Sequence, residues 1–338
     1  MQLLQVCNVG SIVGGTAACA WSVTRARPDW SHRVAVLGRV DDATQAAFAP
    51  VPIASIDRVT PSIVGGAEAV LLHNTPPGRV DALAVPSLLM RHSDVAPAEA
   101  TATVACSRDL ADRIAARTGP ADPVLHQDVL HQGVPQPPPS GPRRLDDRLT
   151  AGWLCTPTAR KWPRDRVAFC RRLAESCPHV DFEFVGCPAA MRAALLDACG
   201  GCAVFHPAGW SARRHLSRWD ALLYHNPAVP ETFGRTVAEA MLAGCVPVVD
   251  RRGGFIEQVD DRRTGILCER PSEFAAALHR LSDLFERRRI AAAASESAHR
   301  RFGLDAFGRR LDRVFASMLG AEAVRTKDGP AISGAASW

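Results

Sequence analysis

Lysine and long apolar runs are both scarce in this sequence of 338 residues. Only Lys161 and Lys327 among its 40 basic residues are lysine, a bias typical of a genome rich in G and C. No apolar run approaches the roughly 20 residues that span a bilayer, and residues 1–9 carry no basic segment ahead of their apolar side chains. These absences predict a cytoplasmic protein without a transmembrane helix, in which a retained lysine has a specific use.

A dense basic tract is missing from the first half of the chain, and the net charge of +5 is small for this length. Nucleic acid is therefore not the expected partner. Arginines cluster late in the chain, at 287–289, 300–301 and 309–310, where they are typical of solvated helix faces. Weak attraction to an anionic membrane surface is the alternative for these arginines.

A second pair of closely spaced cysteines is also lacking. The eleven cysteines are scattered, mostly inside apolar patterns, as expected of small buried side chains in a reducing compartment. Cys199 and Cys202 form the one close pair, but it follows a predicted helix, whereas a thioredoxin-type pair opens one. No further pair completes a zinc site, so we expect neither a metal nor a redox cofactor.

The hydrophobic content of 47% is enough for two cores, and the length suits two α/β domains of roughly 150 residues each. Four prolines at 137–142 remove backbone donors and fix φ, which predicts a linker. The expected organisation is an N-terminal domain at 1–135, a linker at 136–145, a C-terminal domain at 146–304, a final helix at 305–319 and a loose tail at 320–338.

Short apolar strands alternate with helices in both halves, which predicts an α/β fold with two parallel, Rossmann-like sheets. The expected strands of the first half are 3–9, 33–38, 69–73, 86–91, 104–106 and part of 129–135. Those of the second half are 150–155, 182–186, 203–205, 221–225, 246–250 and 265–268. A glycine-rich turn at 10–15 joins the first strand to a helix, where glycine serves either tight packing or the approach of a phosphate.

The most specific stretch, residues 230–257, reads PETFGRTVAEAMLAGCVPVVDRRGGFIE. It predicts a loop, a helix over 235–242, a strand and a glycine turn within one short segment. The amides of Phe233, Gly234 and Arg235 at the start of the helix have no partner inside it, and the helix dipole adds partial positive charge. This segment therefore favours an anionic ligand such as a diphosphate.

Two glutamates accompany that helix: Glu231 lies just before it and Glu239 lies within it. A carboxylate can accept hydrogen bonds from vicinal hydroxyls, as on a ribose or another sugar. The alternative is that Glu231 balances the helix dipole and that Glu239 is solvated.

The segments Glu-Thr-Phe-Gly, Glu-Ala-Met-Leu-Ala-Gly-Cys-Val-Pro-Val-Val and Gly-Gly-Phe-Ile-Glu occur here in this order. Together they closely resemble the nucleotide-sugar site of retaining GT-B glycosyltransferases, the glycosyltransferase family 4-like group. The resemblance implies two Rossmann-like domains whose parallel sheets face each other across a cleft, with the final helix crossing back to the first domain. It also implies that Glu231 lies by the donor sugar, that Glu239 binds the ribose, and that Thr232, Phe233 and Gly234 belong to the donor site.

The same resemblance assigns donor contacts to two other loops. Gly14 and Gly15 correspond to a loop that meets the donor phosphates or sugar. Lys161 corresponds to a lysine on the donor phosphates, and a compact ammonium suits a pyrophosphate oxygen. Trp153 stands where the family carries an arginine, so Arg160, next to Lys161, is the candidate for that contact. The alternative for Lys161 is a surface lysine near a helix start.

Histidines end two of the predicted strands, where α/β sheets place their ligand sites. His92 follows the strand at 86–91, and the resemblance places such a histidine beside the donor sugar and the reaction centre. His73, at the end of 69–73, is its competitor, and either histidine can instead cap a strand by bonding backbone. We expect His92, Glu231 and Lys161 to be the catalytic residues.

The implied function is retaining transfer of a sugar from a nucleoside diphosphate sugar to a small acceptor, with no metal required. No carboxylate is evident that could act as a covalent nucleophile, so front-face displacement is favoured over double displacement, which stays open. A catalytically silent nucleotide-sugar-binding module and a GT-B-like epimerase or phosphorylase are the alternative functions. A natural product, an envelope precursor and a lipid headgroup are the candidate acceptors, in that order.

Overall fold

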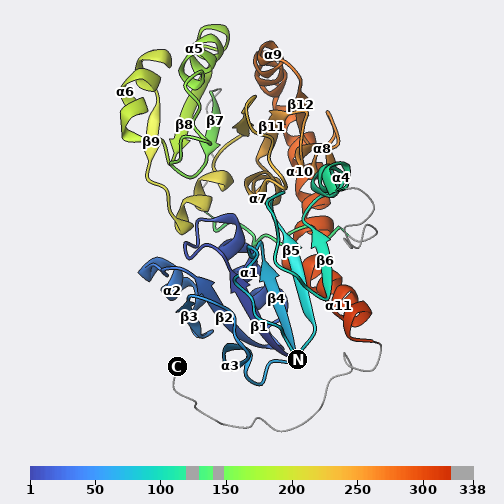
Figure 1. Cartoon of the computed structure of the whole chain (residues 1–338). Helices are drawn as coiled ribbons and strands as arrows, with labels where there is room; N and C mark the ends of the chain where they lie inside the picture. Colours follow the sequence, from blue (N-terminus) through green and yellow to red (C-terminus); the bar gives the residue numbers. More distant parts are fainter. Residues whose placement is uncertain (119–128, 140–147, 321–338) are drawn as a thin grey trace. The chain divides into compact units, whose positions relative to one another are not determined.

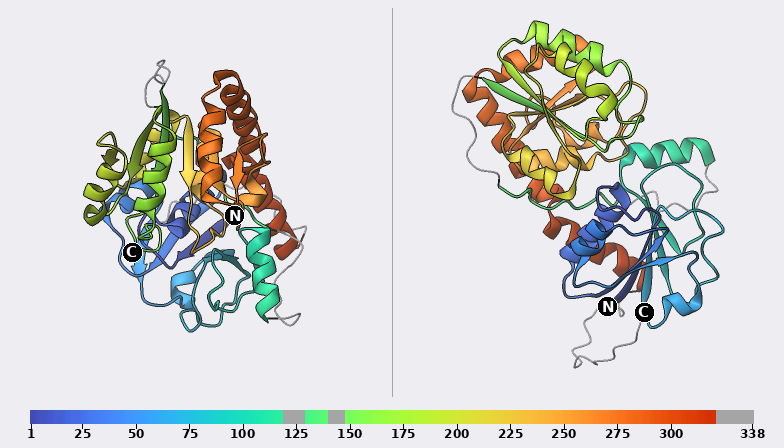
Figure 2. Two further views of the ribbon diagram at one scale, coloured as in Figure 1. Left: turned by 90° about the horizontal axis from the view of Figure 1, so that it is seen from above. Right: turned by 90° about the vertical axis from the view of Figure 1, so that its left-hand side faces the viewer.

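The computed structural model describes residues 1–118, 129–139 and 148–320. The contacts divide the chain into two units: Met1–Gly133 together with the segment that begins at Leu304, and Val134–Gly303. Each unit is built on one parallel sheet flanked by helices (Figure 1; Figure 2). This α/β organisation confirms the fold class predicted from the sequence. Positions 140–145 of the expected linker and 321–338 of the expected tail lie outside the described residues.

The sheet of the N-terminal unit has the strand order β3-β2-β1-β4-β5-β6. Its strands are β1 (Gln2–Cys7), β2 (Ser31–Leu37), β3 (Ile53–Ile56), β4 (Ala69–His73), β5 (Ser87–Arg91) and β6 (Ala102–Ala105). Its helices are α1 (Gly15–Ala26), α2 (Asp42–Phe48), α3 (Pro61–Val64), α4 (Arg108–Thr118) and α11 (Leu304–Leu319). The strand order reverses between β1 and β4, so the carboxyl ends of these two strands flank the point where such sheets bind ligands.

The strands β4, β5 and β6 are buried on both faces, as parallel strands covered by helices must be. Leu4, Val70, Leu72 and Leu89 belong to one continuous apolar core. The chain's last described helix, α11, packs against α1 of the same unit. A Cβ on Gly308 of α11 would lie 2.7 Å from the Ala26 carbonyl oxygen, so only glycine allows the two helices to approach this closely.

The sheet of the C-terminal unit has the strand order β12-β11-β10-β7-β8-β9. Its strands are β7 (Leu149–Leu154), β8 (Val180–Val185), β9 (Val204–His206), β10 (Ala221–Tyr224), β11 (Val246–Asp250) and β12 (Ile266–Cys268). Its helices are α5 (Arg166–Ser176), α6 (Ala189–Ala198), the 3₁₀ helix η2 (Trp210–Ser217), α7 (Arg235–Leu242), α8 (Phe255–Gln258), α9 (Pro271–Leu281) and α10 (Leu284–Phe302). The order reverses between β7 and β10, where Ala221 pairs with Ala151, so the loops that follow these two strands meet at one edge.

Two expectations about the elements are wrong. Residues 129–135 form no strand, and Leu130 only donates one hydrogen bond to the Ala105 carbonyl. The edge strand β3 was not expected, because Ile53–Ile56 is short and follows a proline-containing turn. All eleven cysteines are free, and all but Cys202 are buried, as predicted. None of the helices in the described parts of the chain is both long enough and apolar enough to cross a membrane.

Candidate functional site

Lys161 and Glu231 meet at the carboxyl ends of β7 and β10. The ammonium of Lys161 donates to Glu231 Oε1, and it lies 3.2 Å from the Tyr224 hydroxyl, which itself donates to Glu231. The side chains of Lys161 and Glu231 are each 15% exposed. Asn226 holds the lysine loop in place, because its side-chain amide donates to the Arg160 carbonyl at 2.9 Å. The structure therefore joins two of the residues expected to be catalytic.

Tyr224 is the residue of this cluster that the sequence analysis missed. It is the sole tyrosine of the chain and the last residue of β10, and its ring stacks on Trp153 with centroids 5.4 Å apart and planes 20° apart. Burial raises the pKa of Tyr224 well above its usual value, and nearby Cys155 and Glu231 add to the shift, so the hydroxyl keeps its proton and donates. A unique tyrosine at the end of a central strand was the available signal.

Glycines shape the loop that carries Glu231. Gly254 donates its amide to the Glu231 carbonyl at 2.8 Å, and a Cβ on Gly253, whose φ is +60°, would overlap that same carbonyl. Gly234 caps α7 with a φ of +84°, and a Cβ there would overlap the Phe255 ring. These glycines are required by close backbone approach and by positive φ. They explain why the loop and the glycine turn occur together in the sequence.

Glu239 is buried on α7, with 2% of its surface exposed. Its Oε1 lies 2.9 Å from Nε of Arg213 and 3.6 Å from an NH2 of Arg235. Neither contact meets hydrogen-bond geometry, so the buried Oε1 has no hydrogen-bond partner among the described residues. The alternative that Glu239 is a solvated surface residue is therefore wrong. Arg213 was not anticipated; it lies on η2, and its guanidinium stacks 3.5 Å from the centre of the Trp210 ring.

Arg166, the first residue of α5, was also missed. It is 1% exposed, and its guanidinium stacks on Trp153 at 3.4 Å from the ring centre. None of its three side-chain nitrogens has a hydrogen-bond partner in the described part of the chain. Burial lowers the pKa of Arg166. Trp153, which stands where the resembled family has an arginine, is thus sandwiched between this cation and Tyr224.

The remaining donor-site candidates occupy different settings. Phe233 is buried, whereas Thr232 is half-buried and the Arg160 side chain is exposed. In the N-terminal unit, Gly14 precedes α1 and Gly15 is its first residue. A Cβ on Gly15 would meet nothing within 4 Å, so the packing of its own unit does not require glycine there.

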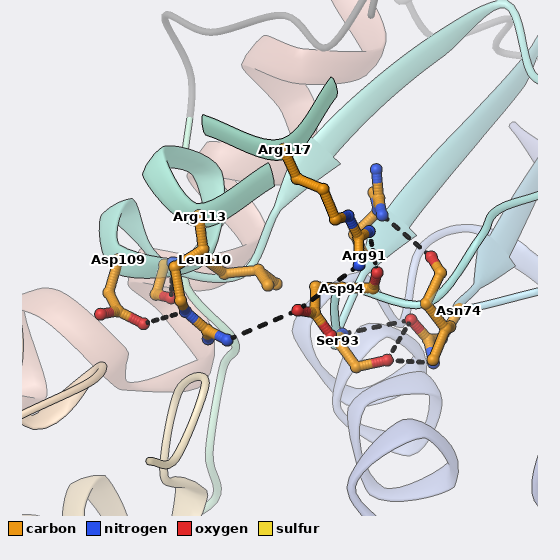
Figure 3. Close-up of polar contacts among 10 residues, drawn as sticks. Asn74, Arg91, Ser93, Asp94, Asp109, Leu110, Arg113 and Arg117 are labelled. Atoms are coloured by element: carbon orange, nitrogen blue, oxygen red, sulfur yellow. Dashed lines mark hydrogen bonds and ion pairs between the residues drawn. The ribbon is translucent and has the colours of Figure 1, made fainter. Parts of the chain in front are cut away.

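His92 follows β5 directly, and its position is fixed by Asn74 at the end of β4. Asn74 adopts a φ of +53°, an uncommon conformation that asparagine tolerates better than most residues. Its Oδ1 accepts from the amides of His92 and Ser93, each at 3.2 Å. Figure 3 shows Asn74 and Ser93 side by side, next to Asp94 and the arginines of α4. The ring nitrogens of His92 contact His73 and Gln132.

Two groups of side chains among the described residues offer three ligand-type atoms within 4.8 Å of one another. They are Cys19, His73 and His92, and Glu183, His206 and His215. In the second group, Glu183 accepts hydrogen bonds from Trp219 and His206, both at 2.9 Å, and from Arg218 at 3.1 Å. These donors satisfy its carboxylate without a metal.

Two parallel six-stranded sheets with this connectivity define the GT-B class of fold. The structure aligns with HepE from Anabaena, solved with UDP-glucose, at a TM-score of 0.73 and 15% identity over 94% of this chain and 100% of that one. A glycosyltransferase from Rickettsia africae gives 0.72 and 12% over 94% and 98%. Sucrose-phosphate synthase from Thermosynechococcus elongatus gives 0.67 and 13% over 95% and 100%. At these identities the likeness shows the fold.

One stretch of the sequence matches a known family. Residues 161–283 match the family model of group 1 glycosyl transferases. Residues 161–283 therefore form a group 1 glycosyltransferase domain, which confirms the resemblance of residues 230–257 to glycosyltransferases with the GT-B fold. The matched residues 161–283 contain Lys161, Tyr224, Glu231 and Glu239. No curated protein matches the sequence.

Proposed function

We propose that the protein is a retaining glycosyltransferase that moves a hexosyl group from a nucleoside diphosphate sugar to a small acceptor. The observation that carries the proposal is the partly buried cluster of Lys161, Tyr224 and Glu231, which lies inside the segment matched by the group 1 model. HepE, a protein of the same fold, was solved with UDP-glucose, and this supports a nucleotide sugar as the donor class.

Glu239 is the proposed ribose contact. Oε1 lies near Arg213 and Arg235 but has no hydrogen-bond partner among the described residues, so it can accept a hydrogen bond from a ribose hydroxyl. The two arginines also place positive charge beside this buried carboxylate. An ionised carboxylate makes stronger hydrogen bonds to hydroxyls than a neutral group does.

Lys161 is the proposed electrostatic catalyst. Its ammonium has three N–H donors, and the described residues use two of them, through Glu231 and Tyr224. The third can bind a phosphate oxygen of the donor. Negative charge grows on the diphosphate as the sugar leaves, and a fixed cation stabilises that charge. Glu231, which accepts from both Lys161 and Tyr224, is the proposed acceptor for a hydroxyl of the donor sugar.

The proposed reaction needs no metal, and front-face displacement assisted by the departing phosphate is the proposed course. Gly14, Gly15, Arg160, Thr232, Phe233 and Gly234 stay predicted donor contacts, and a small natural product ranks ahead of an envelope precursor or a lipid headgroup as the acceptor. Each of these assignments is a proposal.

The test is a panel of nucleoside diphosphate hexoses incubated with the full-length protein and candidate acceptors. Mass spectrometry would detect the product, and proton NMR of the new anomeric centre would give its configuration. We expect transfer with retention, lost in Glu231→Gln. Tight nucleotide binding without transfer or hydrolysis would indicate a binding module instead. Turnover that depends on inorganic phosphate would indicate a phosphorylase, and an inverted product would overturn retention.

A further inference from the structure

A continuous chain of hydrogen bonds runs through the N-terminal unit from Gln5 to Gln132. His73 Nε2 lies 3.0 Å from Gln5 Oε1, and His73 Nδ1 lies 3.2 Å from His92 Nε2. His92 Nδ1 lies 3.1 Å from the side-chain nitrogen of Gln132. All four residues are buried; His92, the most accessible, is 9% exposed. The chain links β1, β4 and the residue after β5 at the carboxyl edge of the sheet.

With the side-chain amides of Gln5 and Gln132 oriented as in the structure, the direction of every bond in this chain is set. The carbonyl oxygen of Gln5 can only accept, so His73 Nε2 must carry a hydrogen. Burial lowers the pKa of His73 to about 3, so His73 is neutral and its Nδ1 can only accept. His92 Nε2 must then be the donor to His73. The amide nitrogen of Gln132 can only donate, and His92 Nδ1 accepts from it.

Both ends of the chain are carboxamides, which neither take up nor release a proton at ordinary pH. A proton gained by His92 would have no route to a buried base along this chain. It would also break a hydrogen bond, because a protonated His92 would present two donors, and Gln132 also donates. Two further titratable groups lie nearby: Cys19, with its sulfur within 4.8 Å of both imidazoles, and Cys7, which pairs with His73 across β1 and β4.

We propose that Gln5, His73 and Gln132 are positioning residues that hold His92 neutral, in one orientation and with its proton on Nε2. Asn74 fixes the main chain of His92 in the same way, through its hydrogen bond to the His92 amide. Resting on the proposed function, this assigns His92 a fixed position beside the donor sugar, with both ring nitrogens already engaged by His73 and Gln132. A histidine held in this way does not act as a general acid or base.

The direct test is long-range proton–nitrogen NMR of protein labelled with nitrogen-15 at histidine, without any substrate. The variants His92→Asn and His73→Asn identify the two sets of signals. We expect both imidazoles to be neutral Nε2–H tautomers at neutral pH. An Nδ1–H tautomer or a protonated ring at His92 would overturn the proposal. So would coordination shifts of both rings on adding zinc chloride alone, since a metal shared with Cys19 needs the same nitrogens.

Substitutions of Gln5 test whether a change at one end of the hydrogen-bond chain alters the tautomer of His92. In Gln5→Glu the new carboxylate raises the pKa of His73, and a protonated His73 would donate from Nδ1. His92 must then accept at Nε2 and donate from Nδ1 to the oxygen of a turned Gln132 amide, so acidification should switch the His92 tautomer in this variant and not in the native protein. Gln5→Leu should broaden or shift the His92 signals, whereas Gln2→Leu, at an exposed position of the same strand, should not. An unmoved His92 in both Gln5 variants would refute the coupling.

Activity gives a second measurement. Asparagine at position 73 can offer an oxygen acceptor to His92 Nε2, whereas leucine cannot. The His73→Asn variant should therefore retain most of the native kcat for transfer, whereas kcat should fall about tenfold in His73→Leu. The nucleotide affinity should be unchanged in both variants. Equal losses in the two variants, in folded protein, would contradict positioning. If no donor is turned over at all, the proposed function fails. The tautomer measurements still decide whether Gln5, His73 and Gln132 position His92.

Discussion

Lys161 and Tyr224 are rare residue types in this chain, and they contact each other. A compact ammonium can donate in three directions at once, and two of these are used to hold a carboxylate and a phenol. Arginine, the chain's usual cation, would present a planar fork that fits this small space differently. The rarity of lysine therefore helped to identify Lys161 as a functional residue. The single tyrosine was an equally strong signal, but composition alone does not show that Tyr224 contacts Lys161.

Replacing Glu239 by alanine should weaken nucleotide binding. The loss should be about 1–3 kcal/mol, as for hydrogen bonds to a charged group. Isothermal titration calorimetry with nucleoside diphosphates would measure it. Glu296→Ala, which removes an exposed glutamate on α10, is the matched control and should leave the affinity unchanged. If folded Glu239→Ala binds as tightly as the native protein, Glu239 is not part of the nucleotide site.

Replacing Lys161 by alanine should depress transfer far more than stability. Removing a preorganised donor to developing charge lowers kcat by about 10²–10³, whereas Glu231 keeps its hydrogen bond from Tyr224 in the variant, so the fold should be retained. Lys161→Arg should also lose activity because of its different shape. Steady-state kinetics and urea denaturation would measure the two effects, with the exposed Arg164→Ala as control. Full activity in both lysine variants would show that the lysine is incidental.

At the scale of elements, the bounds of helices and strands were predicted best where residues of the same segment determine both ends of the element. The helix at Arg235–Leu242 and the strand at Val246–Asp250 have the expected bounds, because the flanking glycines and the apolar run define their ends. Arg213 and Arg166 could not be predicted, since each acquires its meaning from a partner on another element. The pairing of Arg213 with Glu239 depends on where η2 folds over α7.

Gly234 and Gly15 form a contrasting pair for a test of stability. An alanine at Gly234 must adopt a positive φ and overlap Phe255, which should destabilise the fold by about 1–3 kcal/mol. An alanine at Gly15 enters open space at a helix start, so its stability should be unchanged or slightly higher. Urea denaturation would compare them. Equal stability of the two variants would mean that the loop around Glu231 relaxes without strain.

At the scale of the whole molecule, each unit contains a buried histidine that resists protonation. Burial lowers the pKa of His73 to about 3 in the N-terminal unit. Burial, together with the charges of His206 and Arg218, lowers the pKa of His215 to about 4 in the C-terminal unit. Unfolding exposes both imidazoles to water, where their pKa returns to about 6.5. The two units should therefore share one response to acid.

The sign of that response follows from proton binding. Below about pH 6.5 the unfolded chain takes up protons that the folded units exclude, so the free energy of unfolding falls as the pH falls. The loss continues until the folded pKa values are reached, near 4 for His215 and near 3 for His73. Above about pH 6.5 these two histidines add no further dependence.

We therefore expect the urea midpoint of the full-length protein to be higher at pH 7.5 than at pH 5. Each histidine can contribute at most about 1.4 kcal/mol per pH unit in that interval. His73→Asn and His215→Gln each remove one titrating group, so each variant should lose part of the slope while retaining a native circular dichroism spectrum. A midpoint that does not change between these pH values would contradict the assignment of both histidines. An undiminished slope in one variant would show that its histidine is already protonated in the fold, or that the imidazole stays shielded after unfolding.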